Sequence, residues 1–226
     1  MESRFIEPVT LRGAHASLEP LAPEHGEPIR AAAADGALWR LWYTSVPSPE
    51  TTSVWLERAL DMRERLGAMP FAVRDAASGD IVGSTRYFNV DAVNRRLEIG
   101  HTWYARRAQR TAINTECKLL LLTHAFETLG CIAVEFRTHW FNQASRSAIE
   151  RLGAKLDGVL RNHQLLPDGS RRDTVVYSII DGEWPAVRSH LKFLLDRRRA
   201  ATCGDTGSPC RAESSKPARR RDPRSA

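Results

Sequence analysis

Apolar and polar positions alternate along several short segments of the chain, which is the pattern of half-buried β-strands. In the clearest case, residues 96–104, Leu97 and Ile99 face one side of a sheet and Glu98 faces the other. The same period of two predicts further strands at Val9–Leu18, Phe71–Arg74, Ile81–Phe88, Ile132–Thr138, Val159–Leu166 and Thr174–Ile180. Glycine and proline turn residues join two pairs of these strands into hairpins.

Other segments repeat their apolar positions every three to four residues, as amphipathic helices do. The strongest is 115–129, where Cys117 and Leu121 lie on one apolar face and Gly130 ends the helix. Shorter helices are predicted at Pro23–Ala33, Glu50–Leu66, Asn142–Leu152 and Pro185–Leu195. The unit from residue 96 to 138 is expected to be a right-handed crossover between parallel strands, with a ligand at the carboxyl end of the first strand. The element order predicts a mixed α/β fold with helices on both faces of the sheet.

Length and charge limit the possible classes of protein. A chain of 226 residues with 42% hydrophobic content is long enough for one domain with its own core. The sequence contains no run of about 18 apolar residues and no signal peptide, so we expect a cytoplasmic protein that does not contact a membrane. Residues 196–226 contain nine Lys or Arg and four Asp or Glu, which is +5 of the total charge of +6. We expect a folded domain at 1–195 and a disordered basic tail at 196–226, with nucleic-acid contact only weak and only through the tail.

The histidines and cysteines show no pattern of metal ligands, so no metal is predicted. Cys117 and Cys131 are expected to be small core residues, whereas Cys203 and Cys210 have the wrong spacing for a zinc knuckle. His124 is expected at the edge of the core. The role of His163 is left open.

The segment Gln109–Lys118 directly follows the strand at 96–104 and contains the start of a helix. The first N–H groups of a helix lack partners, and the helix dipole adds a partial positive charge, so such a start attracts phosphate. Arg110 is an available cation, and Asn114 is a candidate N-cap. The alternative is a solvated loop charge at Arg110 and ordinary turn and cap residues at Thr111 and Asn114. Because GxxxxGK[ST] and GxGxxG are both absent, nucleoside triphosphates and NAD are not expected.

Several motifs in this order resemble those of the GNAT acetyltransferases. Gln109-x-x-Ala112-x-Asn114 is similar to the (Q/R)xxGx(G/A) loop that holds the pyrophosphate of acetyl-CoA in that family. The Rim-type ribosomal-protein N-terminal acetyltransferases resemble the chain in Leu97–Trp103, Asn114-Thr115-Glu116-x-Lys118, Asn142-x-x-Ser145-x-x-Ala148 and Leu152–Ala154. The resemblance extends over Val9–Leu195 and departs from the family at Ala112 and Asn114, where glycine or another small residue is usual.

This resemblance implies a GNAT-like, mostly antiparallel twisted sheet of about seven strands, whose fourth and fifth strands splay apart around the pantetheine arm. A bulge in the fourth strand is expected to free an N–H group for the thioester carbonyl. The residues expected to bind acetyl-CoA, the acetyl donor, are Ile99, Gly100, His101, Thr102, Trp103, Gln109, Arg110, Thr111, Ala112, Ile113, Asn114 and Asn142. For Asn142, a plain helix N-cap is the alternative.

The reaction implied is direct attack of a neutral primary amine on the thioester, which makes the protein an acyltransferase. A protein α-amine has a pKa near 8 and a lysine near 10.4, so the α-amine is easier to deprotonate by about 3 kcal/mol and needs only a modest base. Glu98 lies beside the expected acetyl site and is the candidate base; its alternative is an ion pair with a cation such as Arg95. Ser145 is at the position proposed to protonate the leaving thiolate; its alternative is a packing or capping residue.

The acceptor favoured by this resemblance is a protein N-terminal α-amine. A small-molecule amine, such as a polyamine, an amino acid or an aminoglycoside, is the main alternative. The other alternative is a non-catalytic domain that binds acyl-CoA as a sensor. Ala112, at a position where glycine is usual, would agree with such a loss of activity. Trp39, Trp42 and Trp55 lie in the segment expected to shape the acceptor site, and His139, Trp140 and Phe141 are expected at the mouth of the cleft, as substrate contacts or loop anchors. The protein is expected to be a monomer or a homodimer.

Overall fold

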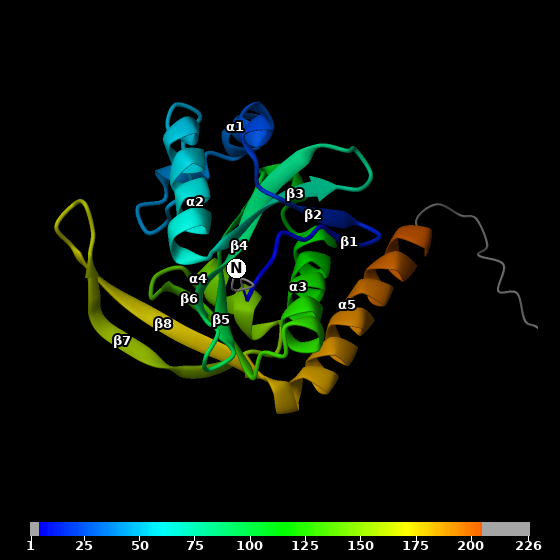
Figure 1. The fold of residues 1–226 in the computed structure, drawn as a ribbon. Helices are drawn as coiled ribbons and strands as arrows, with labels where there is room; N and C mark the ends of the chain where they lie inside the picture. The colour runs from blue at the N-terminus through cyan, green and yellow to red at the C-terminus, as the bar shows by residue number, and fades with distance from the viewer. Residues whose placement is uncertain (1–4, 205–226) are drawn as a thin grey trace, which may run out of the picture.

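The computed structural model describes residues 5–204 and contains one eight-stranded sheet, in the order β1–β2–β3–β4–β5–β6–β8–β7 (Figure 1). The strands are β1 (Leu11–Arg12), β2 (Ala16–Pro20), β3 (Met69–Asp75), β4 (Ile81–Asp91), β5 (Arg96–Tyr104), β6 (Ala133–His139), β7 (Lys155–Leu165) and β8 (Arg171–Ile180). All neighbours are antiparallel except β5 and β6, which are parallel. The predicted mixed, mostly antiparallel sheet and its single parallel crossover are confirmed.

The first strand differs from the prediction. The single strand expected at Val9–Leu18 is wrong, because β1 and β2 form a hairpin whose turn is closed by the Gly13 N–H donating to the Ala16 carbonyl at 2.9 Å. The turn is held from outside its own sequence by Glu116, whose carboxylate accepts the N–H groups of the segment 14–16. The alternation of residue types continues across this turn, so the pattern alone does not show it. The hairpin makes the sheet eight-stranded.

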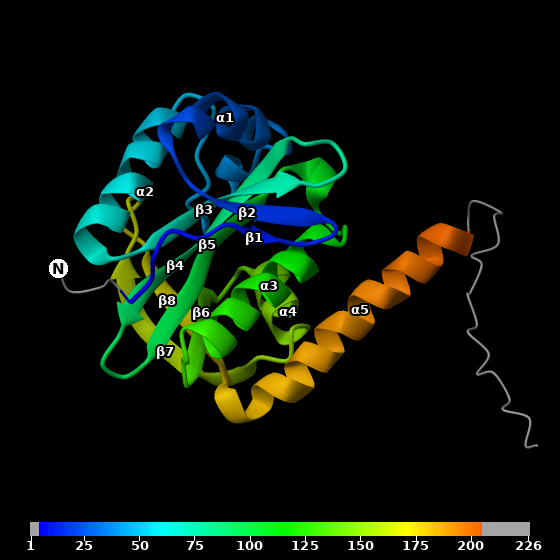
Figure 2. The same ribbon diagram turned by 45° about the vertical axis from the view of Figure 1, so that its right-hand side comes forward.

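Helices cover both faces of the sheet (Figure 2). They are α1 (Gly26–Ala34), α2 (Thr52–Leu66), α3 (Ile113–Thr123), α4 (Gln143–Glu150) and α5 (Trp184–Gly204). The α1 and α2 pair lies on one face, where Trp55 of α2 packs edge-on against Trp103 at 5.9 Å. On the other face the Tyr87 hydroxyl donates to the Leu121 carbonyl of α3 at 2.6 Å.

Most predicted helix ends are confirmed. Gly67, with a φ of 64°, ends α2, and Gly153, with a φ of 98°, follows α4, since glycine adopts this left-handed conformation without strain. The helix predicted at 115–129 is α3 followed by a π-helical turn at His124–Thr128. The last helix continues to Gly204 rather than ending at Leu195. The disordered tail predicted at 196–226 is therefore wrong for residues 196–204, which continue α5, and its remainder, 205–226, lies outside the described residues.

The core lies between the sheet and its two helical layers. Among its largest fully buried side chains are Tyr87, Tyr177, Phe71, Phe136 and Leu121. Cys117 and Cys131 are buried and unpaired, as predicted, and the half-buried His124 stacks on Tyr87 at the edge of the core. In residues 5–204, no group of three or more His, Cys, Asp or Glu is placed to hold a metal ion. Over the same range, no helix has the length and apolar character needed to cross a membrane.

Candidate active site

The centre of the sheet contains an opening between β5 and β6. These strands pair only at Arg96–Ala133, Leu97–Val134 and Glu98–Glu135, although they continue to Tyr104 and His139. Beyond Glu98 and Glu135 the two strands therefore run apart. The splayed strand pair predicted from the sequence is confirmed; it is β5 and β6 here because the first hairpin adds a strand.

A β-bulge lies in β5 at this opening. Gly100 is opposite Arg86 and Trp103 is opposite Ser84, so His101 and Thr102 share the place opposite Thr85. His101 has a φ of 49°, in the left-handed region where such bulges place one residue. The extra residue interrupts the hydrogen-bond ladder, which leaves backbone N–H groups of β5 available beside the opening. The expected bulge is confirmed.

Gly100 brings bare backbone next to this bulge. A Cβ atom built there would lie 2.6 Å from the ring of Phe88 and 3.5 Å from Oε1 of Glu98. The Phe88 ring in turn packs edge-on against His101 at 4.8 Å. The missing side chain therefore allows Phe88 and Glu98 to lie directly over the backbone of β5.

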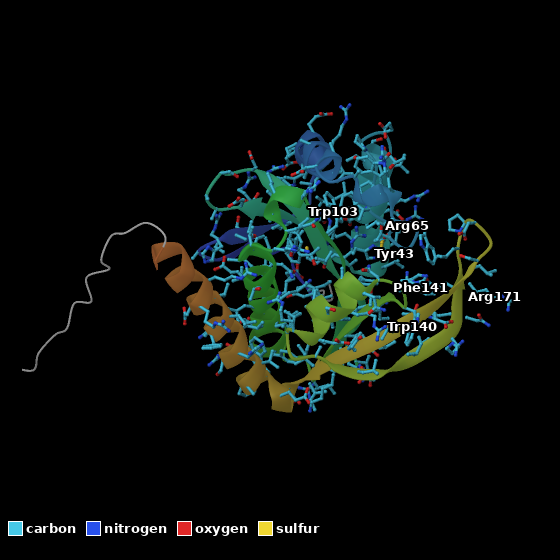
Figure 3. All side chains as sticks on the ribbon, turned by 180° about the vertical axis from the view of Figure 1, so that it is seen from behind. Tyr43, Arg65, Trp103, Trp140, Phe141 and Arg171 are labelled. Atoms are coloured by element: carbon cyan, nitrogen blue, oxygen red, sulfur yellow. The ribbon has the colours of Figure 1, made fainter. Side chains whose placement is uncertain are left out.

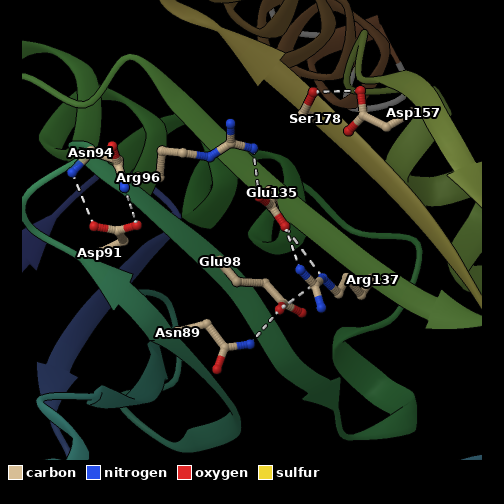
Figure 4. A network of polar contacts seen from close by, with 9 residues as sticks. All are labelled: Asn89, Asp91, Asn94, Arg96, Glu98, Glu135, Arg137, Asp157 and Ser178. Carbon is tan, nitrogen blue, oxygen red and sulfur yellow. Dashed lines mark hydrogen bonds and ion pairs between the residues drawn. The ribbon is translucent and has the colours of Figure 1, made fainter. Parts of the chain in front are cut away.

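Glu98 is a buried carboxyl group at the last paired position of β5 (Figure 4). Its Oε2 accepts a hydrogen bond from Asn89 Nδ2 at 2.9 Å and lies 3.4 Å from Nε of Arg137. Burial raises the pKa of Glu98 to about 7, because desolvation outweighs the lowering by the Asn89 hydrogen bond and the Arg137 charge. A carboxylate with that pKa can take up a proton near neutral pH.

A network of charges surrounds Glu98 on the same side of the sheet (Figure 4). Glu135 accepts hydrogen bonds from Arg96 at 2.6 Å and from Arg137 at 2.8 Å. Burial alone would raise the pKa of Glu135, but the hydrogen bonds from Arg137 and Arg96 outweigh it and hold the pKa below its ordinary value. A cavity of about 200 Å³ is lined by Asn89, Asp91, Arg96, Leu97, Glu98, Glu135 and Arg137. Glu98 thus opens on a small cavity in which carboxylates and guanidinium groups are paired.

The helix start expected to bind phosphate is the beginning of α3. Ala112 takes the N-cap position without a side-chain cap, so the prediction that Asn114 caps this helix is wrong; Asn114 lies inside its first turn. Thr111 Oγ1 receives the N–H of Ile113 at 3.3 Å, while no acceptor within residues 5–204 pairs with the N–H groups of Asn114 and Thr115. Two N–H groups at the start of α3 remain available to an anion.

The loop before α3 is fixed by two side-chain bonds. Gln109 donates to the carbonyl of Tyr104 at 3.0 Å, and Thr111 donates to that of Ala108 at 2.7 Å. Arg110 has a φ of 60°, in the left-handed region that glycine adopts most readily. The loop therefore reaches the start of α3 with its backbone held in place.

Two arginines that the sequence analysis did not select reach the same helix start. Arg151, at the end of α4, donates to Thr115 Oγ1 at 3.3 Å. Arg198, on α5, donates to the carbonyl of Arg110 at 2.5 Å. The proximity of the two positive charges also lowers the pKa of Arg151, although burial is the larger cause. Arg198 was assigned to the basic tail, because a run of three arginines does not show that its helix folds back onto α3.

Asn142 and Ser145 both lie at the start of α4. Asn142 Oδ1 accepts the N–H of Ser145 at 3.1 Å, so the N-cap alternative for Asn142 is present. The cap uses only the oxygen of the amide, and no acceptor among the described residues pairs with its Nδ2. Asn142 can therefore cap α4 and still donate a hydrogen bond to a ligand.

Aromatic side chains gather where β6 ends (Figure 3). Trp42 lies 4.9 Å from His139 and 5.8 Å from Phe141, and Trp42 and Phe141 are exposed. Trp140 instead stacks on the guanidinium of Arg146 at 4.6 Å. Trp42 and Phe141 thus form an exposed aromatic pair over the buried His139, between the segment after α1 and the end of β6.

Two other residues named from the sequence, Trp55 and His163, have structural contacts. Trp55 packs on Trp103 inside the molecule, and His163 is exposed on β7, bonded to Thr174 at 3.1 Å. Asn89 and Arg137 also contact Glu98 and were not among the residues predicted from the sequence. The alternation of strand 132–138 places Arg137 on one face with Glu135 and would have suggested it, but nothing in the sequence indicates Asn89.

A splayed parallel strand pair, a bulge beside the opening and a helix start with two available N–H groups are together the features of an acetyltransferase of the GNAT type. The model of the acetyltransferase (GNAT) domain matches residues 16–155, and the chain belongs to this family. The family, the fold class and the acyltransferase class predicted from the sequence are confirmed.

Individual relatives agree with this assignment. YdaF of Bacillus subtilis (strain 168), whose name assigns it provisionally as a ribosomal N-acetyltransferase, is 35% identical over 106 residues, 47% of this chain and 57% of YdaF. The match thus spans little more than half the length of that relative. A GCN5-related N-acetyltransferase from Brucella melitensis is 30% identical, with a TM-score of 0.77 over 84% of this chain and 86% of that one.

A more distant structural neighbour was solved in complex with coenzyme A. RimL, a ribosomal L7/L12 α-N-protein acetyltransferase in complex with coenzyme A, is 18% identical, with a TM-score of 0.64 over 76% of this chain and 99% of that one. At this identity the likeness shows a shared fold.

Proposed function

We propose that this protein transfers the acetyl group of acetyl-CoA to a primary amine, and that the amine is the α-amino group of a protein N-terminus. The observation that carries the proposal is Glu98, a buried carboxyl group with a pKa of about 7 at the point where β5 and β6 separate. It is placed to accept a proton from an amine that approaches the opening.

Acetyl-CoA supplies the activated acetyl group as a thioester. Its pyrophosphate would meet the free N–H groups of Asn114 and Thr115, with Arg110 and Arg151 as nearby cations. Asn142 Nδ2 would hold the pantetheine arm, and the N–H groups freed by the bulge at His101 and Thr102 would donate to the thioester carbonyl. The unpaired hydrogen-bond donors of the protein thus match the hydrogen-bond acceptors along the length of acetyl-CoA.

In the reaction, the amine nitrogen forms a bond to the carbonyl carbon and the carbon–sulfur bond breaks. Glu98 accepts the proton that the nitrogen loses. The nitrogen attacks as the neutral amine, so the ammonium first releases one proton to water, which for a pKa near 8 costs about 1 kcal/mol at pH 7. For a lysine ε-amine with a pKa near 10.4 the same release costs about 5 kcal/mol.

The cavity beside Glu98 favours a chain terminus over a polycation. Its volume of about 200 Å³ is below the range of about 300–1,000 Å³ typical of small-molecule sites, so only one end of an acceptor fits. Its acidic groups are also largely balanced by Arg96 and Arg137, which leaves little excess negative charge to attract a polyamine. A polyamine, an amino acid or an aminoglycoside is the competing acceptor, and an acyl-CoA sensor is the competing non-enzymatic function.

Two measurements test this function in turn. Acetyl-CoA at saturation should raise the Tm of the protein, because a ligand that binds only the folded state stabilises it. A thiol-release assay with peptides that have free N-termini, the same peptides with blocked N-termini, polyamines and aminoglycosides should then give turnover with the free N-termini. No change in Tm would contradict acetyl-CoA binding, turnover only with small amines would contradict the acceptor, and binding without any turnover would favour the sensor. Cytoplasmic location and oligomeric state stay predictions.

A further inference from the structure

Lys118 on α3 is a buried lysine whose role the proposed function does not explain. Only 5% of the residue is exposed. Its Nζ donates to Thr102 Oγ1 at 2.9 Å and lies 3.4 Å from Thr85 Oγ1, and these two hydroxyls are hydrogen-bonded to each other at 2.7 Å. Nζ also lies 6.0 Å from the centre of the Phe136 ring.

These contacts place the Lys118 amine at the opening between β5 and β6. Thr102 belongs to the bulge of β5, and Phe136 is the first residue of β6 beyond the last paired position, Glu135. One amine therefore contacts both walls of the opening, just where the strands have separated. A thioester bound with its carbonyl at the bulge would have its sulfur in this space.

Lys118 lies on the opposite face of the sheet from Glu98. Ile99 is paired with Tyr87, whose hydroxyl bonds to α3, so Ile99 faces α3 and its neighbour Glu98 faces away. Glu98 thus reaches the opening from the α1–α2 face, where the amine would bind. Lys118 reaches it from the face of α3, whose first N–H groups would hold the pyrophosphate.

No carboxylate neutralises Lys118. It takes part in none of the ion pairs of residues 5–204, and Glu116 on the same helix is turned to the hairpin of β1 and β2. The adjacent Cys117 thiol is neutral at physiological pH, because burial raises its pKa to about 12. Thr85 on β4, Thr102 on β5 and Phe136 on β6 are uncharged, so every element packed around Nζ leaves the ammonium without a counter-charge.

An unpaired ammonium is an expensive way to fill a buried position. Desolvation penalises the charge, and two hydroxyls compensate only part of it. The other inward positions of α3, such as Leu121 and Leu122, are filled by apolar side chains. A methionine would fill the place of Lys118 without this cost, which indicates that the amine is retained for its chemistry.

We propose that Lys118 is a further catalytic residue, whose ε-ammonium faces the sulfur of the bound thioester and donates a proton to the departing thiolate. This rests on the proposed function, since it requires acetyl-CoA in the opening. Burial lowers the pKa of Lys118 to about 8, close to that of a thiol, so the proton can pass in this direction near neutral pH.

The protons balance across the reaction. The amine nitrogen bonds to the carbonyl carbon and gives its proton to Glu98, while the electron pair of the broken carbon–sulfur bond goes to sulfur, which takes a proton from Lys118 Nζ. Lys118 ends neutral and Glu98 ends protonated, and exchange with water restores both. In this proposal Lys118 takes the acid role for which Ser145 was the candidate from the sequence; the cap of α4 uses the backbone N–H of Ser145 and not its hydroxyl.

The direct test is the ionisation of bound coenzyme A, measured by the ultraviolet absorbance of its thiolate. In the wild-type protein the ammonium should lower the thiol pKa, and in Lys118→Met the thiol should ionise about one to two pH units higher. Lys155→Met, at an exposed lysine paired with Glu183, is the matched control and should titrate as wild type. Thr102→Val keeps the lysine and removes its hydroxyl acceptor, and serves if Lys118→Met does not fold; it should shift the titration measurably.

Kinetics provide the second readout. Lys118→Met should lower kcat about 100-fold and leave KM for acetyl-CoA within about threefold, with a Tm equal to or above that of wild type. Equal thiol titration in wild type and Lys118→Met, or an unchanged kcat, would overturn the role of Lys118 and leave the proposed function standing. A wild-type protein that lowers the thiol pKa but acetylates no amine would support the contact and contradict the proposed transfer, and no binding of coenzyme A would overturn both.

Discussion

At the scale of single residues, the pKa of Glu98 is determined by opposing electrostatic effects. Its pKa of about 7, against an ordinary 4.5, means that desolvation outweighs the contacts with Asn89 and Arg137. The folded protein therefore keeps a proton between pH 4.5 and 7 that the unfolded chain has released, so this group lowers stability as pH rises through that window. At pH 8 the loss is about 3 kcal/mol.

Asn89 should tune the pKa of Glu98 through its hydrogen bond to the carboxylate. Asn89→Gly removes the hydrogen bond that favours the ionised carboxylate and keeps a residue suited to the φ of 47° at this position. The pKa of Glu98 should rise further, which moves the acidic limb of the pH profile of kcat/KM upward by about one pH unit.

The control is Asn162→Gly on β7, which makes the same change at a similar φ of 50° in an exposed strand. It should leave the profile unchanged. An acidic limb that stays in place in Asn89→Gly would show that Asn89 does not act on the catalytic group.

At the scale of elements, α3 is fixed at its start by the first hairpin. Glu116 accepts the N–H of Ala14 at 2.9 Å, of His15 at 2.5 Å and of Ala16 at 2.7 Å. Gly13 is required beside it, because a Cβ atom there would lie 2.4 Å from the Glu116 carboxyl carbon. This clamp ties the start of α3, the proposed pyrophosphate site, to the edge of the sheet.

Loss of the clamp should affect both stability and donor binding. Glu116→Gln replaces one acceptor oxygen with a donor that faces backbone N–H groups, so the free energy of unfolding should fall by about 3 kcal/mol. Acetyl-CoA affinity should fall with it, as measured by calorimetry below the Tm. Glu57→Gln on the exposed side of α2 is the control and should change neither. Equal stability of Glu116→Gln and wild type would contradict the clamp.

The elements differ in how far the sequence predicts them. Period-two alternation gave β5 at its observed bounds, and glycines marked the ends of α2 and α4, because these signals are local. The hairpin of β1 and β2 could not be predicted, since Glu116, about one hundred residues away, stabilises its turn. Asn114 was assigned as a helix N-cap from residue type alone. The N-cap is Ala112 and α3 begins at Ile113, so Asn114 lies inside the first turn.

At the scale of the whole molecule, the sheet separates two approaches to one opening. The α1–α2 face carries Glu98 and the small charged cavity, whereas the α3 face carries Lys118 and the free N–H groups. Family motifs indicated the donor side from the sequence, because they are contiguous. Arg198 could not be predicted, because it reaches the start of α3 only through the packing of α5. Asn89 could not be predicted either, because its role depends on a hydrogen bond to Glu98 that the sequence does not show.

Glu98 is the proposed base for an N-terminal amine, and one measurement tests this role most directly. The pH profile of kcat/KM for acetyl transfer to a peptide N-terminus should be compared in wild type and Glu98→Gln. Wild type should show an acidic limb near pH 7, and Glu98→Gln should lose that limb together with about 100-fold or more of the rate. An unchanged rate and an unchanged limb in Glu98→Gln would contradict the account.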